Sequence, residues 1–435
     1  MEKTITDWQK IILQTNWIKR IKYFDAILTT IWSKPIKIIT WFRRSGKSFL
    51  VKQIAKELVD SWNFFIDNIL YLNFEDVALS EHLDTKKALE IIEIFQTQIA
   101  KNGKKLIIFD EIQLVENRDK LLRTIYEKNI NSEYEMIITG SNSWLLSSEL
   151  SSSLAGRFIE FEILPFEFSE FLGYKKAFPK TKNEYLRNQL EIKKLFFEFL
   201  NRWGLPECFE INTIDAKKSY LLWVWNKVIL DDIIKRFKIR NIDQFEKTVR
   251  FVFSNIWNIT SIKSILNKFI WIWDFSISEI QINKFVKYIQ KTFGIYKISK
   301  FDRKVSKIFK ETAKYYSVDN GISSALHTSL QEIYDKKLEN IVFLFLKKHF
   351  SEDIYFGRNK EWKEIDFIYK NWNIFNKVQV CYELNEENKN RELWNFKLCD
   401  KYLKWEDTMI FYENKIKNRD EDYKLNNIIE FLLFL

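Results

Sequence analysis

Apolar residues follow two alternating patterns over the first 175 residues of the chain. Short apolar runs occur near residues 36–39, 69–72, 106–109 and 136–138, of which the first is interrupted by Lys37, and amphipathic stretches separate them. Continuous runs of this length are typical of strands buried on both faces of a parallel sheet, whereas apolar residues three or four positions apart indicate helices. The pattern predicts an α/β domain with a parallel sheet at residues 1–175.

The first apolar run leads into Trp41-Phe-Arg-Arg-Ser-Gly-Lys47-Ser48 and then into an amphipathic segment. Except for its first residue, this segment matches the phosphate-binding pattern GxxxxGK[ST] between a strand and a helix. In such a loop, backbone N–H groups hold phosphate oxygens, the lysine reaches the β- and γ-phosphates, and the serine ligates Mg²⁺. ATP and Mg²⁺ are therefore the expected cofactors. The expected nucleotide-binding residues are Trp41, Arg43, Arg44, Ser45, Gly46, Lys47 and Ser48.

Four further candidates for nucleotide chemistry lie downstream of the phosphate loop. Asp110 and Glu111 close the run at 106–109, where Asp110 would hold Mg²⁺ together with Ser48 and Glu111 would orient or deprotonate the attacking water. Asn142 follows the next strand and is placed to contact the γ-phosphate or the water. Arg157, after Gly156, is a candidate arginine finger, and a structural salt bridge is the alternative.

The motifs of the first 175 residues resemble those of prokaryotic AAA-type ATP-binding proteins that carry an uncharacterised C-terminal domain. The similar segments are WFRRSGKSFL, YLNFED, IIFDEIQ, ITGSNSWLLSSELSSSLAGR and LPFEFSEFL, then RWGLPE, NKVILDDIIKRFKIRN, FSNIWNITSIKSI, YYSVDNGI and LENIVFLFL. The resemblance covers most of the chain. It implies a P-loop AAA-type ATPase fold for the first domain.

The middle of the chain is expected to be helical. Residues 176–245 show helical apolar spacing and are interpreted as a connector. Residues 246–325 contain amphipathic segments followed by a hairpin-like pair of strands, an order that resembles a winged helix. Its third helix carries Lys284, Lys287 and Lys291, which are placed to contact DNA phosphates. The alternatives are an ordinary solvated face and a protein-contact module.

Residues 326–435 resemble the restriction-endonuclease-like PD-(D/E)xK fold. Glu339 lies on a predicted helix, and Asp366 and Gln379 lie on two predicted strands, where carboxylates of that fold hold Mg²⁺. Cys381 occupies the position of the lysine that helps to place the attacking water. A neutral thiol lacks that charge, so we expect an inactive, binding-only domain unless Lys363 or Lys377 substitutes in space.

Composition sets broad limits on partners and compartment. The net charge is +10 and the pI about 9.1, which is compatible with DNA contact, although the lysines are dispersed. No apolar stretch approaches the roughly 20 residues of a membrane span, and the N-terminus has no signal-peptide pattern. Cys208, Cys381 and Cys399 form no CxxC pair. We expect a cytoplasmic protein without a membrane partner.

Tryptophan occurs where glycine is expected. The chain has 9 glycines and 16 tryptophans, and several tryptophans lie in polar, turn-like surroundings. In the resembling family, the positions of Trp41, Trp203 and Trp257 are glycine positions. We hypothesise that these residues, together with Trp362 and Trp372, are glycines in the native protein because a reassigned stop codon has been read as tryptophan. Trp405 lies in a similar turn-like context.

The sequence thus predicts an AAA-type ATPase that couples Mg²⁺-dependent ATP hydrolysis to an unknown, DNA-related target. If Arg157 acts in trans, the site requires a homo-oligomer or a protein partner. Two alternatives stay open. One is a nucleotide-gated DNA-binding or interaction protein without turnover, and the other is an ATP-regulated nuclease.

Overall fold

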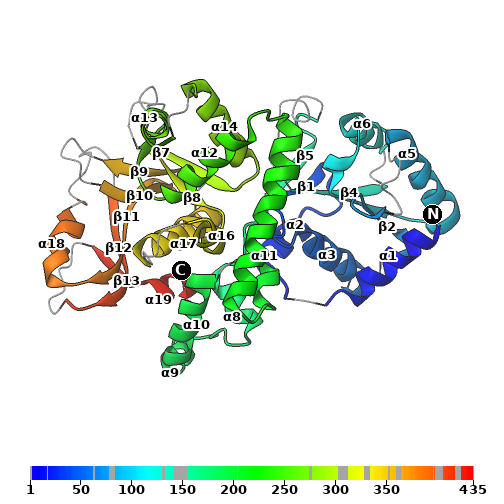
Figure 1. Cartoon of the computed structure of the whole chain (residues 1–435). Helices are drawn as coiled ribbons and strands as arrows, with labels where there is room; N and C mark the ends of the chain where they lie inside the picture. Colours follow the sequence, from blue (N-terminus) through cyan, green and yellow to red (C-terminus); the bar gives the residue numbers. More distant parts are fainter. Residues whose placement is uncertain are drawn as a thin grey trace. The chain divides into compact units, whose positions relative to one another are not determined.

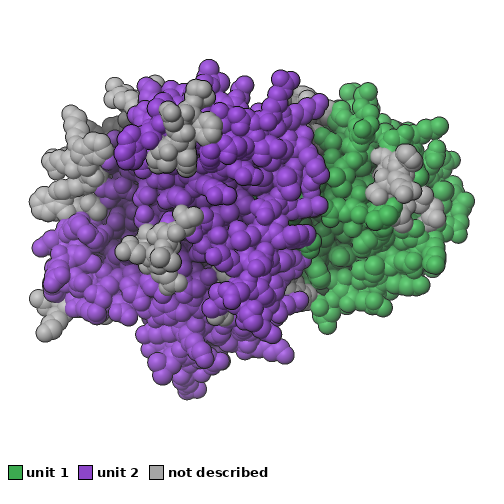
Figure 2. Space-filling model, in the orientation of Figure 1, with its two compact units in different colours: residues 1–163 green, residues 164–435 purple. Residues whose placement is uncertain are grey.

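The chain divides into two units, Met1–Ile163 and Leu164–Leu435, in the computed structural model (Figures 1 and 2). Each unit has its own sheet. No helix in the described part of the chain combines the length and the apolar character needed to cross a membrane. The structure describes residues 2–16, 18–61, 64–77, 84–129, 133–141, 154–202, 204–273, 277–301, 312–327, 334–350, 353–358, 364–394, 396, 405–416 and 423–434.

The first unit contains a five-stranded parallel sheet in the order β2-β3-β4-β1-β5. This confirms the α/β fold with a parallel sheet. The strand β4 lies between β1 and β3, so the strand that enters the phosphate loop and the strand that ends in Asp110 are both its neighbours. The strands are β1 Ile36–Thr40, β2 Ile69–Asn73, β3 Lys105–Asp110, β4 Tyr134–Gly140 and β5 Phe158–Glu162.

Both faces of strands β1–β4 are buried, as their apolar runs predict, and the edge strand β5 is partly buried. Alternate residues of β1–β4 form one cluster with α5 and α6, and α3 packs on β3 and β4 (Figure 1). A buried sheet of this kind leaves its loops as the place for chemistry. The helices are α1 Glu2–Gln14, α2 Ile21–Leu28, α3 Lys47–Ser61, α5 Thr85–Ile94 and α6 Arg118–Lys128, with short turns η1 Ile66–Asn68, η2 Phe95–Ile99 and η3 Ile112–Leu114.

The second unit begins with helices that gather around a buried carboxylate. Asp319 is 2% exposed and accepts hydrogen bonds from the backbone N–H groups of Gly204 at 2.7 Å, Gly321 at 2.7 Å and Ile322 at 3.0 Å. The carbonyl of Gly204 accepts from the N–H of Phe166 at 2.7 Å. A side chain at Gly204 would meet the Phe166 carbonyl at 2.7 Å. Three distant segments of the chain are therefore joined at this point.

The residues predicted to form a helical connector are helical. The helices before the first strand of the second unit are α8 Phe168–Tyr174, α9 Lys182–Arg187, α10 Gln189–Arg202, η5 Pro206–Phe209, α11 Ile214–Lys227, η6 Val228–Lys235 and α12 Ile242–Ser254.

The second sheet has eight strands in the order β13-β12-β11-β10-β9-β7-β8-β6. It is continuous because β7 pairs in parallel with β9, joining the antiparallel group β6-β8-β7 to the strands of the last hundred residues. The strands are β6 Thr260–Ser261, β7 Ile295–Lys300, β8 Thr312–Ser317, β9 Ile354–Arg358, β10 Glu364–Asn371, β11 Ile374–Leu384, β12 Trp405–Asn414 and β13 Lys424–Asn427. The helices among them are α13 Ile262–Trp273, α14 Glu279–Lys291, α16 Asn320–Leu326, α17 Tyr334–His349, α18 Glu386–Trp394 and α19 Ile428–Phe434.

Tryptophans occupy backbone conformations that favour glycine. Ten described residues other than glycine have positive φ, and four of them are tryptophans: Trp32 at 68°, Trp41 at 156°, Trp257 at 72° and Trp372 at 54°. A bulky side chain is a genuine outlier in this region. The conformations of Trp41, Trp257 and Trp372 support the glycine hypothesis, and Trp32 extends it.

One tryptophan that the sequence placed in a turn lies in a strand instead. Trp405 begins strand β12 and packs against Phe375 at a ring distance of 5.4 Å, so its interpretation as a turn residue is wrong. The two polar residues that follow it in the sequence suggested a turn, but the parallel pairing of β12 with β11 decides its conformation. Trp203 and Trp362 lie outside the described residues.

We predict that Trp372→Gly stabilises the second unit. Trp372 is 91% exposed at the tight turn between β10 and β11, so its removal loses little packing, whereas relief of the positive φ should raise the free energy of unfolding by about 1 kcal/mol. Urea denaturation of both proteins measures the difference. Trp8→Gly is the control that should destabilise, because Trp8 lies inside helix α1 and packs against Tyr71 at 4.9 Å.

Candidate nucleotide site

The candidate site lies where the central strands of the parallel sheet end. Thr40 closes β1, Asp110 closes β3, and Thr139 lies near the end of β4 between them. The pairing of Ile39 with Thr139 and of Phe109 with Ile138 brings these ends to one edge. Because carboxyl ends of parallel strands share an edge, the loops after them meet there, as in open α/β sheets generally.

The Asp110 carboxylate is the hydrogen-bonding centre of this edge. It is 2% exposed and accepts from the hydroxyl of Ser48 at 3.0 Å, and also from the hydroxyls of Thr139 and Tyr71. Burial, followed by the charge of Glu111, raises the pKa of the Asp110 carboxyl, and the three hydroxyl hydrogen bonds oppose that rise. The loop serine and the strand aspartate, 62 residues apart, are thus in direct contact.

Lys47 is held at the mouth of the loop. Its ammonium is buried and donates to the carbonyls of Trp41 and Phe42, each at 3.2 Å. Gly46 has φ 92°, which only glycine adopts without strain, and helix α3 begins at Lys47 immediately afterwards. The loop therefore curls around the lysine, and the first N–H groups of a 15-residue helix follow it.

Two other loop positions carry unusual conformations. Trp41 is fully buried with φ 156°, and Arg44 has φ 66°. Arg43 forms an ion pair with Glu75 at 3.5 Å, and the carbonyl of Ser45 accepts from the Arg20 guanidinium at 3.2 Å. Residues outside the loop thus fix its backbone.

Glu111 lies beside the same edge in a left-handed conformation, with φ 59°. Its N–H donates to the Thr139 hydroxyl at 3.0 Å, and its carboxylate accepts from the Gln113 amide. That amide also donates to the Ser141 hydroxyl at 3.1 Å. The carboxylate is therefore held by Gln113, whose amide is shared with the residue that follows β4.

Two catalytic candidates remain, and the structure describes only one of them, Arg157, which is not part of this cluster. Asn142 lies outside the described residues. Arg157 precedes β5, and its carbonyl accepts from the N–H of Ile36 at the start of β1. Five residues of β1 separate that point from the loop, about 16 Å at the rise of a strand. Its guanidinium lies 3.9 Å from the Glu127 carboxylate, so within its own chain it is away from the phosphate loop.

Comparison with known proteins identifies the fold of this unit. An AAA domain matches residues 33–172, and a domain of unknown function matches residues 193–332. The uncharacterized protein MJ1544 of Methanocaldococcus jannaschii is 33% identical over 379 residues, which span 85% of this chain and 79% of that protein. The chain belongs to the same family as that protein. Its first unit carries the AAA domain, and the chain is an AAA-type P-loop protein.

Two further proteins are similar over most of the chain. An uncharacterized protein of Haemophilus influenzae is 29% identical over 371 residues, which span 85% of this chain and 88% of the relative. Among solved structures, the Walker-type ATPase PABY2304 of Pyrococcus abyssi aligns with a TM-score of 0.48 and 16% identity, over 71% of this chain and 96% of that one.

Outside the AAA domain, the carboxylates predicted for a nuclease-like site surround a lysine. Lys314 on β8 is 2% exposed, and its ammonium lies 2.8 Å from Glu339 on α17 and 3.3 Å from Asp366 on β10. It also forms an ion pair with Glu364. The structure thus brings Glu339 and Asp366 together, as the sequence predicts, but with a cation of the protein between them.

The charged groups in this cluster shift the pKa values of one another. Burial raises the pKa of the Asp366 carboxyl well above its usual range, and the charge of Glu339 adds to the shift. The pKa of the Lys314 ammonium is also raised, because the charge of Glu339 and its neighbours outweighs the effect of burial. Among the described residues, no group of three or more His, Cys, Asp or Glu side chains is placed to hold a metal ion.

Two residues of the neighbouring strand β11 that the sequence connected with a nuclease-like site have partners within the protein. Gln379 accepts from the N–H of Asp366 at 3.3 Å and donates to Glu392 at 2.9 Å. Lys377 is fully buried and pairs with Asp407 at 2.9 Å, so it does not substitute in space for the lysine that Cys381 replaces. Lys363 lies outside the described residues.

Sequence reasoning missed several side chains at both places. Tyr71 lies within an apolar run, where nothing distinguishes its hydroxyl from a core ring. Thr139 lies at the end of β4, where the sequence does not show which neighbour its hydroxyl would bind. Lys314 had a usable signal, because a lysine inside a strand of buried aromatic residues, TAKYYS, must find a carboxylate partner.

We predict that Lys314→Met destabilises the second unit. The substitution leaves buried carboxylates without a counter-ion, so the free energy of unfolding should fall by about 3–5 kcal/mol in urea denaturation. Lys182→Met is the control, since it removes an exposed pair with Glu430 and should leave the free energy of unfolding nearly unchanged. Equal reductions of stability in the two variants would contradict the assignment.

Proposed function

We propose that the AAA domain binds Mg²⁺-ATP at the Lys47 loop and hydrolyses it. The observation that carries this proposal is the 3.0 Å contact between the Ser48 hydroxyl and the Asp110 carboxylate, which places the two expected metal-binding groups together. The loop that would hold phosphate and the carboxylates that would serve the metal therefore share one edge of the sheet.

The donor set fits Mg²⁺ and a polyphosphate. A hydroxyl and a carboxylate are oxygen ligands of the kind that Mg²⁺ prefers, and Mg²⁺ is usually bound by one or two such groups together with phosphate oxygens. The Lys47 ammonium already donates to two oxygens of the loop, so its charge is held where the β- and γ-phosphates would lie. Bound Mg²⁺ would neutralise charge that develops on the phosphates.

Glu111 is the residue that we assign to the attacking water. Its backbone is fixed through Thr139 and its carboxylate through Gln113, which keeps the carboxylate beside the metal-binding edge. Arg157 is assigned as a finger that acts on the site of another copy or of a partner, because its backbone contacts the start of β1, about 16 Å of strand away from the loop, and its guanidinium pairs with Glu127. Asn142 stays a candidate for contact with the γ-phosphate.

The second unit is proposed to contain two adaptor folds. The order α12, β6, α13, α14, β7, β8, with β6-β8-β7 antiparallel, supports a winged helix at residues 246–325. The order α17, β9, β10, β11, α18, β12 supports a restriction-endonuclease-like fold at residues 326–435. We propose that the latter only binds, because Lys314 occupies the space between Glu339 and Asp366 and Cys381 has replaced the lysine.

The proposed ATP site predicts a dependence on Lys47. In the Trp41→Gly protein, Lys47→Ala should weaken Mg²⁺-ATP binding by about 10- to 100-fold, since it removes charged hydrogen bonds to the phosphates. Isothermal titration calorimetry measures the affinity. Lys56→Ala on the same helix is the matched control, because Lys56 donates to the carbonyl of Thr15 and should leave ATP binding unchanged. Equal affinity before and after the Lys47 change would refute the site.

Turnover is tested separately from binding. Glu111→Gln should reduce the ATP hydrolysis rate by about 10²–10⁴-fold and leave ATP affinity within about twofold. Phosphate release with and without DNA measures the rate. Tight ATP binding without hydrolysis in the unmodified protein would favour the nucleotide-gated binding protein instead. Mg²⁺-dependent DNA cleavage that Asp366→Ala abolishes would favour the nuclease.

A further inference from the structure

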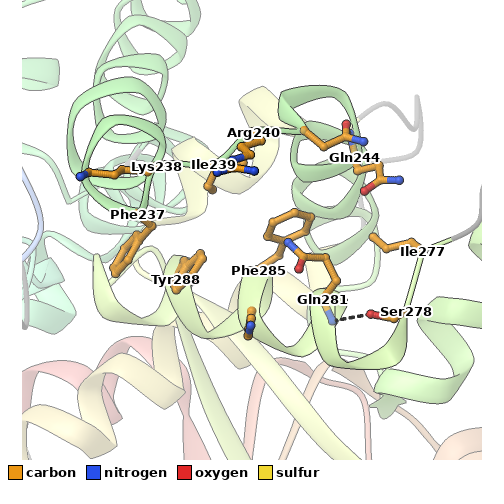
Figure 3. A pocket seen from close by; sticks show the side chains of 12 residues that line it. Phe237, Lys238, Ile239, Arg240, Gln244, Ile277, Ser278, Gln281, Phe285 and Tyr288 are labelled. Carbon is orange, nitrogen blue, oxygen red and sulfur yellow. Dashed lines mark hydrogen bonds between the residues drawn. The ribbon is translucent and has the colours of Figure 1, made fainter.

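An open pocket of about 440 Å³ lies between the segment 237–241 and the N-terminal half of α14 (Figure 3). Residues 237–241 follow η6 and lead into α12, so the pocket has one wall from a connecting segment and another from a helix. The lining residues used below are Lys238, Arg240, Gln244, Gln281, Lys284 and Tyr288.

The charge of this pocket is of one sign. Its lining contains Lys238, Arg240 and Lys284 and no aspartate or glutamate. All three cations are exposed, and none of them forms an ion pair within the described part of the chain. Three uncompensated cations around one hollow favour an anionic ligand.

Lysines on the adjacent helices η6 and α12 form ion pairs, unlike the three cations of the pocket. Lys235 on η6 pairs with Asp231 at 2.7 Å, and Lys247 on α12 pairs with Asp243 at 2.8 Å. The lack of compensation is therefore a property of the pocket and not of the whole surface around it. Pairs of opposite charge four residues apart, such as these two, are typical of solvated helix faces.

The positive surface continues beyond the pocket along α14. Lys284, Lys287 and Lys291 are spaced by three and four residues, so they share one helix face, and they span about 10 Å of its axis. Lys287 also faces Lys297 on β7. Burial, followed by the charge of Lys287, lowers the pKa of the Lys297 ammonium. This row of cations is longer than a single phosphate group. Its length matches about three nucleotides of one strand of a duplex, at 3.4 Å each.

The remaining lining suits a nucleic-acid strand. The amides of Gln244 and Gln281 can donate to phosphate or sugar oxygens (Figure 3). The rings of Phe237 and Tyr288 stack with centroids 3.9 Å apart and an angle of 5°, forming a rigid wall. Lys238 has a positive φ of 49°, which sets the direction of the segment 237–241 beside these rings.

We propose that this pocket holds a backbone phosphate of a nucleic-acid strand that lies along α14. Lys238, Arg240 and Lys284 contact that phosphate, and Lys287 and Lys297 contact the phosphates that follow. The sequence pointed to Lys284, Lys287 and Lys291, and the structure adds the segment 237–241 as the opposite wall. This inference goes beyond ATP hydrolysis and does not depend on it.

Fluorescence anisotropy of the full-length protein tests the proposal with labelled duplex DNA, single-stranded DNA and RNA, each about 30 nucleotides long so that it exceeds the row of cations. The pocket variant is Lys238→Asn, Arg240→Gln and Lys284→Gln combined, in which asparagine tolerates the positive φ. We expect it to weaken binding of the preferred probe at least about tenfold. The slope of log affinity against log salt should fall by about 0.9 for each phosphate that the variant no longer neutralises.

A variant with the same reduction in charge is the control. Lys182→Gln, Lys415→Gln and Lys424→Gln remove three exposed lysines that pair with carboxylates elsewhere on the second unit, and should leave affinity within about twofold. Circular dichroism melting verifies that both variants fold. Failure of the unmodified protein to bind any of the three probes, or an equal weakening in both triple variants, would overturn the proposal. Lys47→Ala should leave binding without ATP unchanged, which separates this test from that of the ATP site.

Discussion

The buried carboxylate of Asp110 is the constraint on which the first unit depends. Hydroxyls from helix α3, strand β2 and strand β4 all donate to it, so one acidic group connects the phosphate loop with two strands of the sheet. A buried carboxylate is costly unless such donors are present. The donors therefore keep a negative charge at the edge where the metal would bind.

A second buried charge organises the other unit. Lys314 joins β8 to α17 and β10, and the pairing of β7 with β9 makes one sheet from strands that the sequence suggested belonged to two domains. The same cluster supports the proposal of a domain that binds without cutting, since the Lys314 ammonium pairs with both Glu339 and Asp366. A buried ion pair of this kind affects stability mainly because removal of one partner leaves the other charge buried and uncompensated.

Much of the first unit could be predicted from the sequence because its signals are local. The apolar runs indicated the strands, and the loop pattern and the acidic pair at 110–111 indicated residues that the structure brings together. Thr139 and Tyr71 could not be assigned, because their roles follow from the insertion of β4 between β1 and β3 and from pairing across the sheet. Lys314 was missed for the same reason, since its partners are 25 and 52 residues away. The glycine hypothesis came from composition and gained its physical basis only from the φ angles.

The most direct measurement is a crystal structure of the Trp41→Gly protein with Mg²⁺ and a non-hydrolysable ATP analogue. We expect phosphate oxygens at the Lys47 ammonium and Mg²⁺ about 2.1 Å from the Ser48 hydroxyl, with the Asp110 carboxylate beside the metal. Nucleotide bound elsewhere, or a metal remote from both Ser48 and Asp110, would contradict the proposed ATP site.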